Sequence, residues 1–204
     1  CFGCHESGDV ISFVQKRDGL SFHEAIQKLA DMYNITIDDF GMKKESQKKS
    51  FAELNKKAAR FYFKNLTTKE NPGLAYLRRR GLTPETIKKF GLGYAADSWH
   101  DLTDYLEKDG ATKQEIFDAQ LSSKSDKNGK TYYYDKFRNR VIFPIIDTRG
   151  RVIGFGGRIL GDGEPKYLNS PESALFSKKD NLFGLNLSRD FIKTKKFAIV
   201  VEGY

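Results

Sequence analysis

The sequence predicts an α+β fold, with helices first, antiparallel strands after residue 131 and one buried strand near the end. Apolar side chains recur at helical spacing before residue 121, and two apolar strands flank the turn signal Asp147-Thr148-Arg149-Gly150. Phe197–Val201 is a continuous apolar run, which is typical of a strand covered on both faces in a parallel sheet. We therefore expect four regions, at residues 1–40, 41–50, 51–196 and 197–204.

The helices are predicted from apolar stripes and from capping residues. Ser21 and Glu24 have capping-box spacing, and Thr83-Pro84 and Gly91 begin and end a short helix. One apolar face of a longer helix contains Phe51, Leu54, Ala58, Phe61 and Tyr62. Residues 41–50 have four lysines and no periodicity, so they are predicted to be a linker.

The strands are predicted from the second half of the chain. Residues 122–130 form a polar loop in this interpretation, and Val141–Ile146 pairs with Arg151–Leu160 as a hairpin. Pro144 cannot donate a ladder hydrogen bond, so it predicts an edge strand or a bulge.

Composition limits the partners. The formal net charge is +8, and residues 136–196 hold 13 Lys/Arg against 6 Asp/Glu, which indicates either a nucleic-acid partner or a solvated basic surface. No apolar run is long enough to span a membrane, so we expect no membrane partner. The chain has only two cysteines, which indicates a reducing, cytoplasmic location.

Two groups of residues suggest metal chemistry. Cys1 and Cys4 have the spacing of two thiolates on a zinc knuckle, although a redox pair or two inert thiols have the same spacing. Glu202 directly follows the apolar run, where a carboxylate could hold Mg²⁺ or transfer a proton. Taken alone, this residue favours an ordinary glutamate at the end of a strand.

Other segments carry cations, aromatic rings and amides of the kind that bind nucleic acid. Lys166, Tyr167 and Asn169 combine a phosphate-neutralising charge, a stacking ring and a hydrogen-bonding amide between two prolines. Gly154-Phe155-Gly156-Gly157 precedes Arg158, and this glycine-rich segment could equally be a strand crossing. Arg138 and Arg140 are expected to share a face at strand spacing, and Arg78-Arg79-Arg80 ends a helix.

Taken together, these segments resemble bacterial DNA primase of the DnaG type along essentially the whole chain. Cys1-Phe2-Gly3-Cys4 is similar to the CHC2 zinc domain, and Pro165–Pro171 followed by Leu175–Lys178 is similar to the polymerase domain. Val200–Tyr204 resembles the start of the Toprim fold. The resemblance divides the chain into half of a zinc domain (1–40), a linker (41–50), the N-terminal basic part of the polymerase domain (51–196) and the first Toprim strand (197–204).

The resemblance implies a role for each candidate residue. Cys1 and Cys4 would be two of four zinc ligands, and the other two would precede residue 1. Glu202 would be the Toprim catalytic glutamate, which acts with Mg²⁺ or Mn²⁺ and with aspartates that follow residue 204. The template and nucleotide groove would contain Arg80, Arg138, Arg140, Arg158, Lys166, Tyr167, Asn169 and Lys178.

The implied function is the synthesis of short RNA primers on single-stranded DNA from ribonucleoside triphosphates, by two-metal nucleotidyl transfer. The implied partners are the template, the triphosphates, the RNA–DNA hybrid product and a replicative helicase that binds a C-terminal domain absent from this chain. Without the later aspartates, we expect this chain alone to be inactive. Two alternatives are a nuclease or topoisomerase of the Toprim type, and a nucleic-acid-binding module without catalysis.

Overall fold

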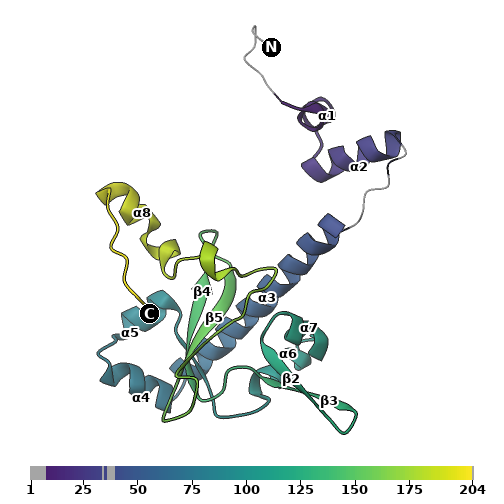
Figure 1. The fold of residues 1–204 in the computed structure, drawn as a ribbon. Helices are drawn as coiled ribbons and strands as arrows, with labels where there is room; N and C mark the ends of the chain where they lie inside the picture. Colours follow the sequence, from purple (N-terminus) through teal and green to yellow (C-terminus); the bar gives the residue numbers. More distant parts are fainter. Residues whose placement is uncertain (1–7, 34, 36–39, 204) are drawn as a thin grey trace. The chain divides into compact units, whose positions relative to one another are not determined.

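The computed structural model describes residues 8–33, 35 and 40–203 of the chain. The fold is α+β, as the sequence predicts. The chain divides into two compact units, Cys1–Glu45 and Ser46–Tyr204 (Figure 1).

The first unit contains helices α1 (Val10–Asp18) and α2 (Phe22–Met32). The Asp9 side chain accepts a hydrogen bond from the Ser12 amide at the start of α1. The predicted capping box of α2 is confirmed, because Ser21 and Glu24 bond each other's backbone amides. On the apolar side of α2, Ala25 is fully buried and Ala30 is 5% exposed.

Helix α3 (Phe40–Thr67) runs through residues 41–50 without interruption, so the segment predicted as a linker without regular structure is helical. The division between the two units falls inside this helix. The later turns of α3 are held by packing, which begins at the buried residues Phe51 and Leu54. Lysine, glutamate and glutamine are good helix formers, so they can extend such a helix without an apolar stripe of their own.

The second unit is built around a four-stranded antiparallel sheet in the order β1-β4-β5-β6. Its strands are β1 (Gly93–Ala95), β4 (Arg140–Ile146), β5 (Val152–Ile159) and β6 (Tyr167–Asn169). Its other elements are α4 (Pro72–Arg79), α5 (Pro84–Phe90), α6 (Asp101–Lys108), α7 (Lys113–Asp118), the strands β2 (Ser122–Lys127) and β3 (Lys130–Asp135), the 3₁₀ helix η1 (Lys178–Asp180) and α8 (Leu185–Lys195). The predicted hairpin of β4 and β5 is confirmed.

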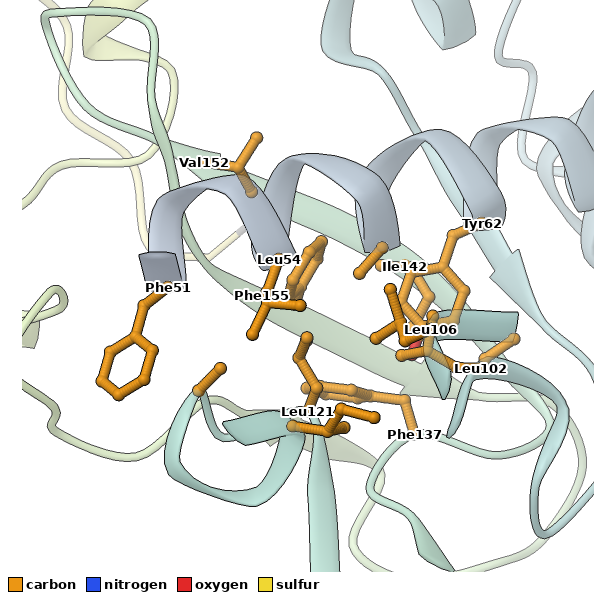
Figure 2. Packing of buried hydrophobic residues seen from close by; sticks show 14 residues of the cluster. Phe51, Leu54, Tyr62, Leu102, Leu106, Leu121, Phe137, Ile142, Val152 and Phe155 are labelled. Carbon is orange, nitrogen blue, oxygen red and sulfur yellow. The ribbon is translucent and has the colours of Figure 1, made fainter. Parts of the chain in front are cut away.

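One face of the sheet packs against α3 and forms the main hydrophobic core (Figure 2). Helix α3 supplies the predicted residues Leu54, Ala58 and Tyr62, and the sheet supplies Ile142 and Phe155. Tyr62 meets the Phe155 ring edge to face, with ring centroids 5.7 Å apart. Burial of these large apolar side chains fixes which face of the sheet is internal.

The opposite face packs against α4 and α5 through a second cluster. Val141 of β4 lies there with Leu77 of α4 and Ile87 of α5. The predicted limits of α5 are confirmed, with the Thr83 side chain capping its start and Gly91 ending it at φ 62°. Successive residues of β4 therefore point into different clusters, as pleating requires.

For the strand that contains Pro144, the prediction of an edge is wrong, and the alternative of a bulge agrees with an irregularity next to the proline. Strand β4 is internal, since it pairs with both β1 and β5. However, the three residues of β1 pair only with 140–142, so β1 has already ended where Pro144 lies. A proline is tolerated there because no strand on that side needs its missing N–H. The ladder with β5 shifts register just after it, between Ile145 and Ile146.

The polar loop predicted at 122–130 is instead mostly strand, because β2 and β3 form a two-stranded hairpin. Asn128 and Gly129 both have positive φ, which is the conformation of a tight hairpin turn. Strand β2 is polar, and its pairing depends on the tyrosine-rich strand β3 opposite it.

The C-terminal stretch also differs from the prediction. No strand forms in the described residues 197–203, and Phe197, Ile199, Val200 and Val201 are each more than 60% exposed. A fully apolar strand is stable only when neighbouring strands satisfy its backbone and other elements cover its faces. Within the described chain no strand pairs with this segment, so the predicted buried strand is not formed here.

Candidate nucleic-acid interface

Strands β5 and β6 bring three predicted residues onto one face of the sheet. Arg158 lies directly opposite Tyr167, and Asn169 lies opposite Gly156, two residues further along β5. Directly opposed residues of an antiparallel pair project from the same face, and so do residues two apart on a strand. Arg158, Tyr167 and Asn169 therefore share the face that α4 also occupies.

The Arg158 guanidinium lies between two aromatic rings. Its central carbon is 5.0 Å from the ring centroid of Tyr76 on α4 and 6.0 Å from that of Tyr167. One terminal nitrogen donates to the carbonyl of Ile159, while the Nε atom is buried without a hydrogen-bond partner. Within the described residues no carboxylate forms an ion pair with Arg158. Its positive charge is held in place by rings and remains available to an anion.

A cavity of about 350 Å³ opens beside this guanidinium. It is lined by Pro72, Ala75, Tyr76, Arg79, Arg158, Leu160 and Gly161. The two lining arginines come from different elements, α4 and β5, and both lie near the Tyr76 ring, because the Arg79 guanidinium is 5.7 Å from its centroid. A hollow with two cations and an aromatic wall suits a phosphate next to a base or sugar.

Arg79 was not among the predicted site residues, whereas its neighbour Arg80 was. Arg80 is the C-cap of α4, is exposed and does not line the cavity. Arg79 lies three residues after Tyr76, so the two share one side of the helix. That spacing is the signal in the sequence that could have identified Arg79.

Arg140, which the sequence predicted to share a face with Arg138 and to lie in the groove, is buried in the structure. Arg140 is only 4% exposed, and its guanidinium donates to the Gly157 carbonyl at 3.0 Å and to the Lys166 carbonyl at 3.5 Å. Burial, together with the nearby charge of Arg138, lowers its pKa from the usual value. Its contacts hold β5 and the start of β6, so in this structure it is a structural residue.

Arg138 lies in a different environment. It precedes β4, and the intervening Asn139 has a φ of 48°, so the alternation of a strand does not apply to the two arginines. The Arg138 guanidinium lies 4.2 Å from the ring centroid of Trp99. The structure thus separates two arginines that the sequence suggested were equivalent.

The remaining predicted basic residues are exposed. Lys166 immediately precedes Tyr167, and its carbonyl accepts a hydrogen bond from the Ile159 amide. Lys178 begins η1, where its backbone amide donates to the Glu172 carboxylate at 2.9 Å. Neither lysine lines the cavity.

Comparison with known proteins identifies the family. The model of the N-terminal domain of the DNA primase catalytic core matches residues 61–189, and that of the CHC2 zinc finger matches residues 1–48. This chain belongs to the DnaG-type DNA primase family. The match to the CHC2 zinc finger implies zinc binding by the N-terminal part of the chain.

Primases of several bacteria match the whole chain. It is 45% identical to the DNA primase of Clostridium acetobutylicum and 44% identical to that of Deinococcus radiodurans. In both comparisons all of this chain is covered, together with 34% of the relative. The chain therefore spans about a third of the length of the curated primases that it matches.

Solved primase structures share the fold. The zinc-binding and RNA polymerase domains of Aquifex aeolicus primase are 38% identical at a TM-score of 0.70, covering 100% of this chain and 49% of that one. The RNA polymerase domain of Mycobacterium tuberculosis DnaG, in complex with double-stranded DNA bearing a 6-nucleotide overhang, is 34% identical at a TM-score of 0.69. That match covers 76% of this chain and 49% of the other. A DnaG catalytic domain bound to single-stranded DNA is 37% identical at a TM-score of 0.65, over 72% and 47% of the two chains.

The predicted metal ligands of this primase chain are not assembled in the described residues. Cys1 and Cys4 lie outside them. Glu202 is described and exposed, in a segment without regular structure. Among the described residues no three His, Cys, Asp or Glu side chains gather as a metal site would require. Glu202 by itself does not make a magnesium site.

None of the helices in the described residues is both long enough and apolar enough to cross a bilayer.

Proposed function

We propose that this chain is the template-binding part of a DNA primase, whose whole protein makes short RNA primers on single-stranded DNA from ribonucleoside triphosphates. The observation that carries the proposal is that Arg158, Tyr167 and Asn169 share one face of the sheet, beside the cavity between α4 and β5. Cations there neutralise phosphates of the template or the triphosphate, and Tyr167 supplies a ring for stacking. The family membership of the chain supports the same function.

The first experiment measures the binding of this chain to fluorescent oligothymidylate over a series of salt concentrations. Each phosphate contact on a single strand contributes a slope of about −0.7 to the plot of log affinity against log salt. Arg158→Ala and Lys166→Ala are each expected to weaken binding and to make this slope shallower by about one contact. Lys88→Ala, which removes the same charge from an exposed position on α5, serves as the control. Binding by Arg158→Ala that equals the wild type at all salt concentrations would refute the assignment of this face.

The second part of the proposal concerns the metals. We propose Cys1 and Cys4 as two zinc ligands, and Glu202 as one carboxylate of a Mg²⁺ or Mn²⁺ site that is completed by other residues of the whole primase. In the whole protein, Cys1→Ser and Cys4→Ser should each lower the bound zinc measured by atomic absorption. Glu202→Gln should abolish primer synthesis and leave the binding of single-stranded DNA intact, since the amide keeps the size of the side chain but loses its charge. Unchanged synthesis would contradict the role of Glu202.

The proposal has further parts. The primase is expected to act in the bacterial cytoplasm, to hold an RNA–DNA hybrid as product and to meet a replicative helicase through a domain outside this chain. A nuclease or topoisomerase of the Toprim type would nick or relax DNA under conditions where a primase incorporates nucleotides. The proteins that match the chain are primases, so they do not favour that alternative.

A further inference from the structure

Helix α4 forms much of the wall of the cavity beside Arg158. Four of the residues that line the cavity belong to this helix, namely Pro72, Ala75, Tyr76 and Arg79. The Tyr76 ring centroid lies 5.0 Å from the Arg158 guanidinium on β5, so the shape of the cavity depends on where α4 lies relative to β5. A helix of eight residues is too short to be stable by itself, so contacts with the rest of the fold must hold α4 in place.

The side chain of Asn71 connects the end of α3 to the start of α4. Its amide group donates to the carbonyls of Asn65 and Leu66 at 3.1 and 2.9 Å, and to that of Lys69 at 2.8 Å. Asn65 and Leu66 lie in the last turn of α3, where carbonyls have no partner within the helix. The Asn71 side-chain oxygen accepts a hydrogen bond from the Leu74 amide at 2.9 Å and so caps α4. One half-buried side chain therefore fixes the corner between the two helices.

Gly73 sets how closely α4 approaches the sheet. It is buried against Tyr94 of β1, and a Cβ atom at this position would lie 2.7 Å from the Tyr94 ring. Only glycine allows the first turn of α4 to lie so near to β1. One turn later, Leu77 of α4 is buried in the same cluster as Leu66 of α3. The Asn71 corner thus determines where α4 begins, and the Gly73 contact determines its distance from the sheet.

A small movement at the corner would be enlarged at the cavity. Arg79 lies about 12 Å along the helix from Asn71, at 1.5 Å per residue. A tilt of roughly ten degrees at Asn71 would therefore move the backbone of Arg79 by about 2 Å. That movement is enough to take the Arg79 guanidinium out of hydrogen-bond reach of a phosphate held by Arg158.

We propose that Asn71 is a positioning residue of the nucleic-acid site. By tying α4 to the end of α3, it places Arg79 where one bound phosphate group can meet both the Arg79 and the Arg158 guanidinium. This inference rests on the proposed binding function, and it adds a residue that lies behind the cavity wall and acts through Arg79.

The first test changes Asn71 without changing the charge. Asn71→Ser keeps a hydroxyl that caps α4, but the hydroxyl is too short to reach the carbonyls of α3. Over a series of salt concentrations, this variant should bind fluorescent oligothymidylate roughly two- to fivefold more weakly than the wild type, with a salt slope shallower by about one contact. These are the effects expected from the loss of Arg79.

Leu54→Ala is the control for stability, because it removes a buried side chain from an earlier turn of α3 and leaves the corner intact. It should lower the stability of the chain and keep the wild-type salt slope. Partial unfolding reduces the amount of active protein, whereas the slope reports the number of phosphate contacts made by the molecules that bind. Urea denaturation of each variant shows whether it has folded.

The second test asks whether Asn71 acts through Arg79. The double variant of Asn71→Ser and Arg79→Ala should bind as weakly as Arg79→Ala alone, because the contact that the first change misplaces is already absent. Gly73→Ala displaces α4 by another route, since its methyl group meets the Tyr94 ring. It should cause the same loss of affinity and of slope as Asn71→Ser, although the hydrogen bonds of Asn71 are kept.

The outcomes distinguish this inference from the proposed function. Wild-type affinity and slope of folded Asn71→Ser would overturn the positioning role and leave the Arg158 interface standing. Weaker binding at the wild-type slope, or losses that add in the double variant, would overturn it too. If Asn71→Ser does not fold, Gly73→Ala decides in the same way. If Arg158→Ala also bound like the wild type, the proposed function would fail, and the positioning role with it.

Discussion

The two faces of the central sheet use the same residue type in opposite ways. Arg140 on β4 points to the face that α3 covers, and its guanidinium donates hydrogen bonds to backbone carbonyls. Arg158, on the adjacent strand, points to the face of α4, where the helix leaves a cavity beside the guanidinium. The two faces differ in how completely helices cover them. An arginine on a fully covered face must bond to the protein itself, whereas an arginine on a partly covered face can bind a ligand.

The largest expected effect comes from removing a buried aromatic side chain on the face of the sheet that α3 covers. Phe155 is fully buried against Tyr62 and Phe137, with ring centroids at 5.7 and 6.2 Å. Phe155→Ala should lower the free energy of unfolding by about 3–5 kcal/mol, because the cavity left behind cannot collapse fully. Urea denaturation measures the change. Tyr167→Ala on the open face is the control, and a loss there comparable to that of Phe155→Ala would contradict the division between the faces.

The second prediction compares the two arginines directly. Arg140→Met keeps most of the side-chain volume but leaves the Gly157 carbonyl without its donor, so it should cost about 1–3 kcal/mol of unfolding free energy. Arg158→Met should cost less than about 1 kcal/mol and should weaken the binding of single-stranded DNA. Denaturation and anisotropy titrations of both variants are needed. If Arg140→Met lost binding but no stability, the roles assigned to the two arginines would be reversed.

The third prediction concerns the pH dependence of stability through Asp147, which lies in the turn between β4 and β5. Burial of the Asp147 carboxylate acts to raise its pKa, but hydrogen bonds from the amides of Arg151 and Arg149 and the Arg151 side chain outweigh it, so the pKa is lowered from 3.8. The ionised carboxylate therefore stabilises the fold fully above pH 4. This contribution is lost as pH falls from about 4 through the lowered pKa.

Asp147→Asn tests that contribution, because the amide oxygen can still accept the backbone hydrogen bonds while the ion pair with Arg151 is lost. The wild type should be more stable than the variant by up to about 1 kcal/mol near neutral pH. Unfolding measured from pH 7 down to pH 2.5 should show this difference shrinking only below pH 4. A constant difference over the whole range would argue against an ionised Asp147 in the fold.

Local signals predicted most of the helices and the central hairpin. The capping box of α2, the limits of α5 and the pairing of β4 with β5 depend on residues close in sequence, so one sequence was enough to predict them. The strand β2 and the helix over 41–50 were missed for a common reason. Both are polar segments whose structure is set by a neighbour, namely the tyrosines of β3 and the buried turns of α3.

The composition of the site was partly predictable, and its geometry was not. Lys166, Tyr167, Asn169 and Arg158 were identified by residue type, and the register of β5 with β6 brings three of them onto one face. Register depends on contacts between distant segments, and the sequence alone could not assign Arg140 to the closed face. The roles of Glu202, Cys1 and Cys4 remain predictions from the resemblance.

The smallest expected effect concerns two adjacent residues at the end of α4. Arg79 lines the cavity and Arg80 does not, although the sequence favoured Arg80. Arg79→Ala should weaken binding of oligothymidylate by roughly two- to fivefold and reduce the salt slope, as expected for one lost phosphate contact at a surface. Arg80→Ala removes the same charge one residue away and should have less effect, so the pair tests position and not total charge. Equal losses for the two variants would mean that α4 attracts the single-stranded DNA only through its overall charge. The position of Arg79 in the cavity would then give it no special role.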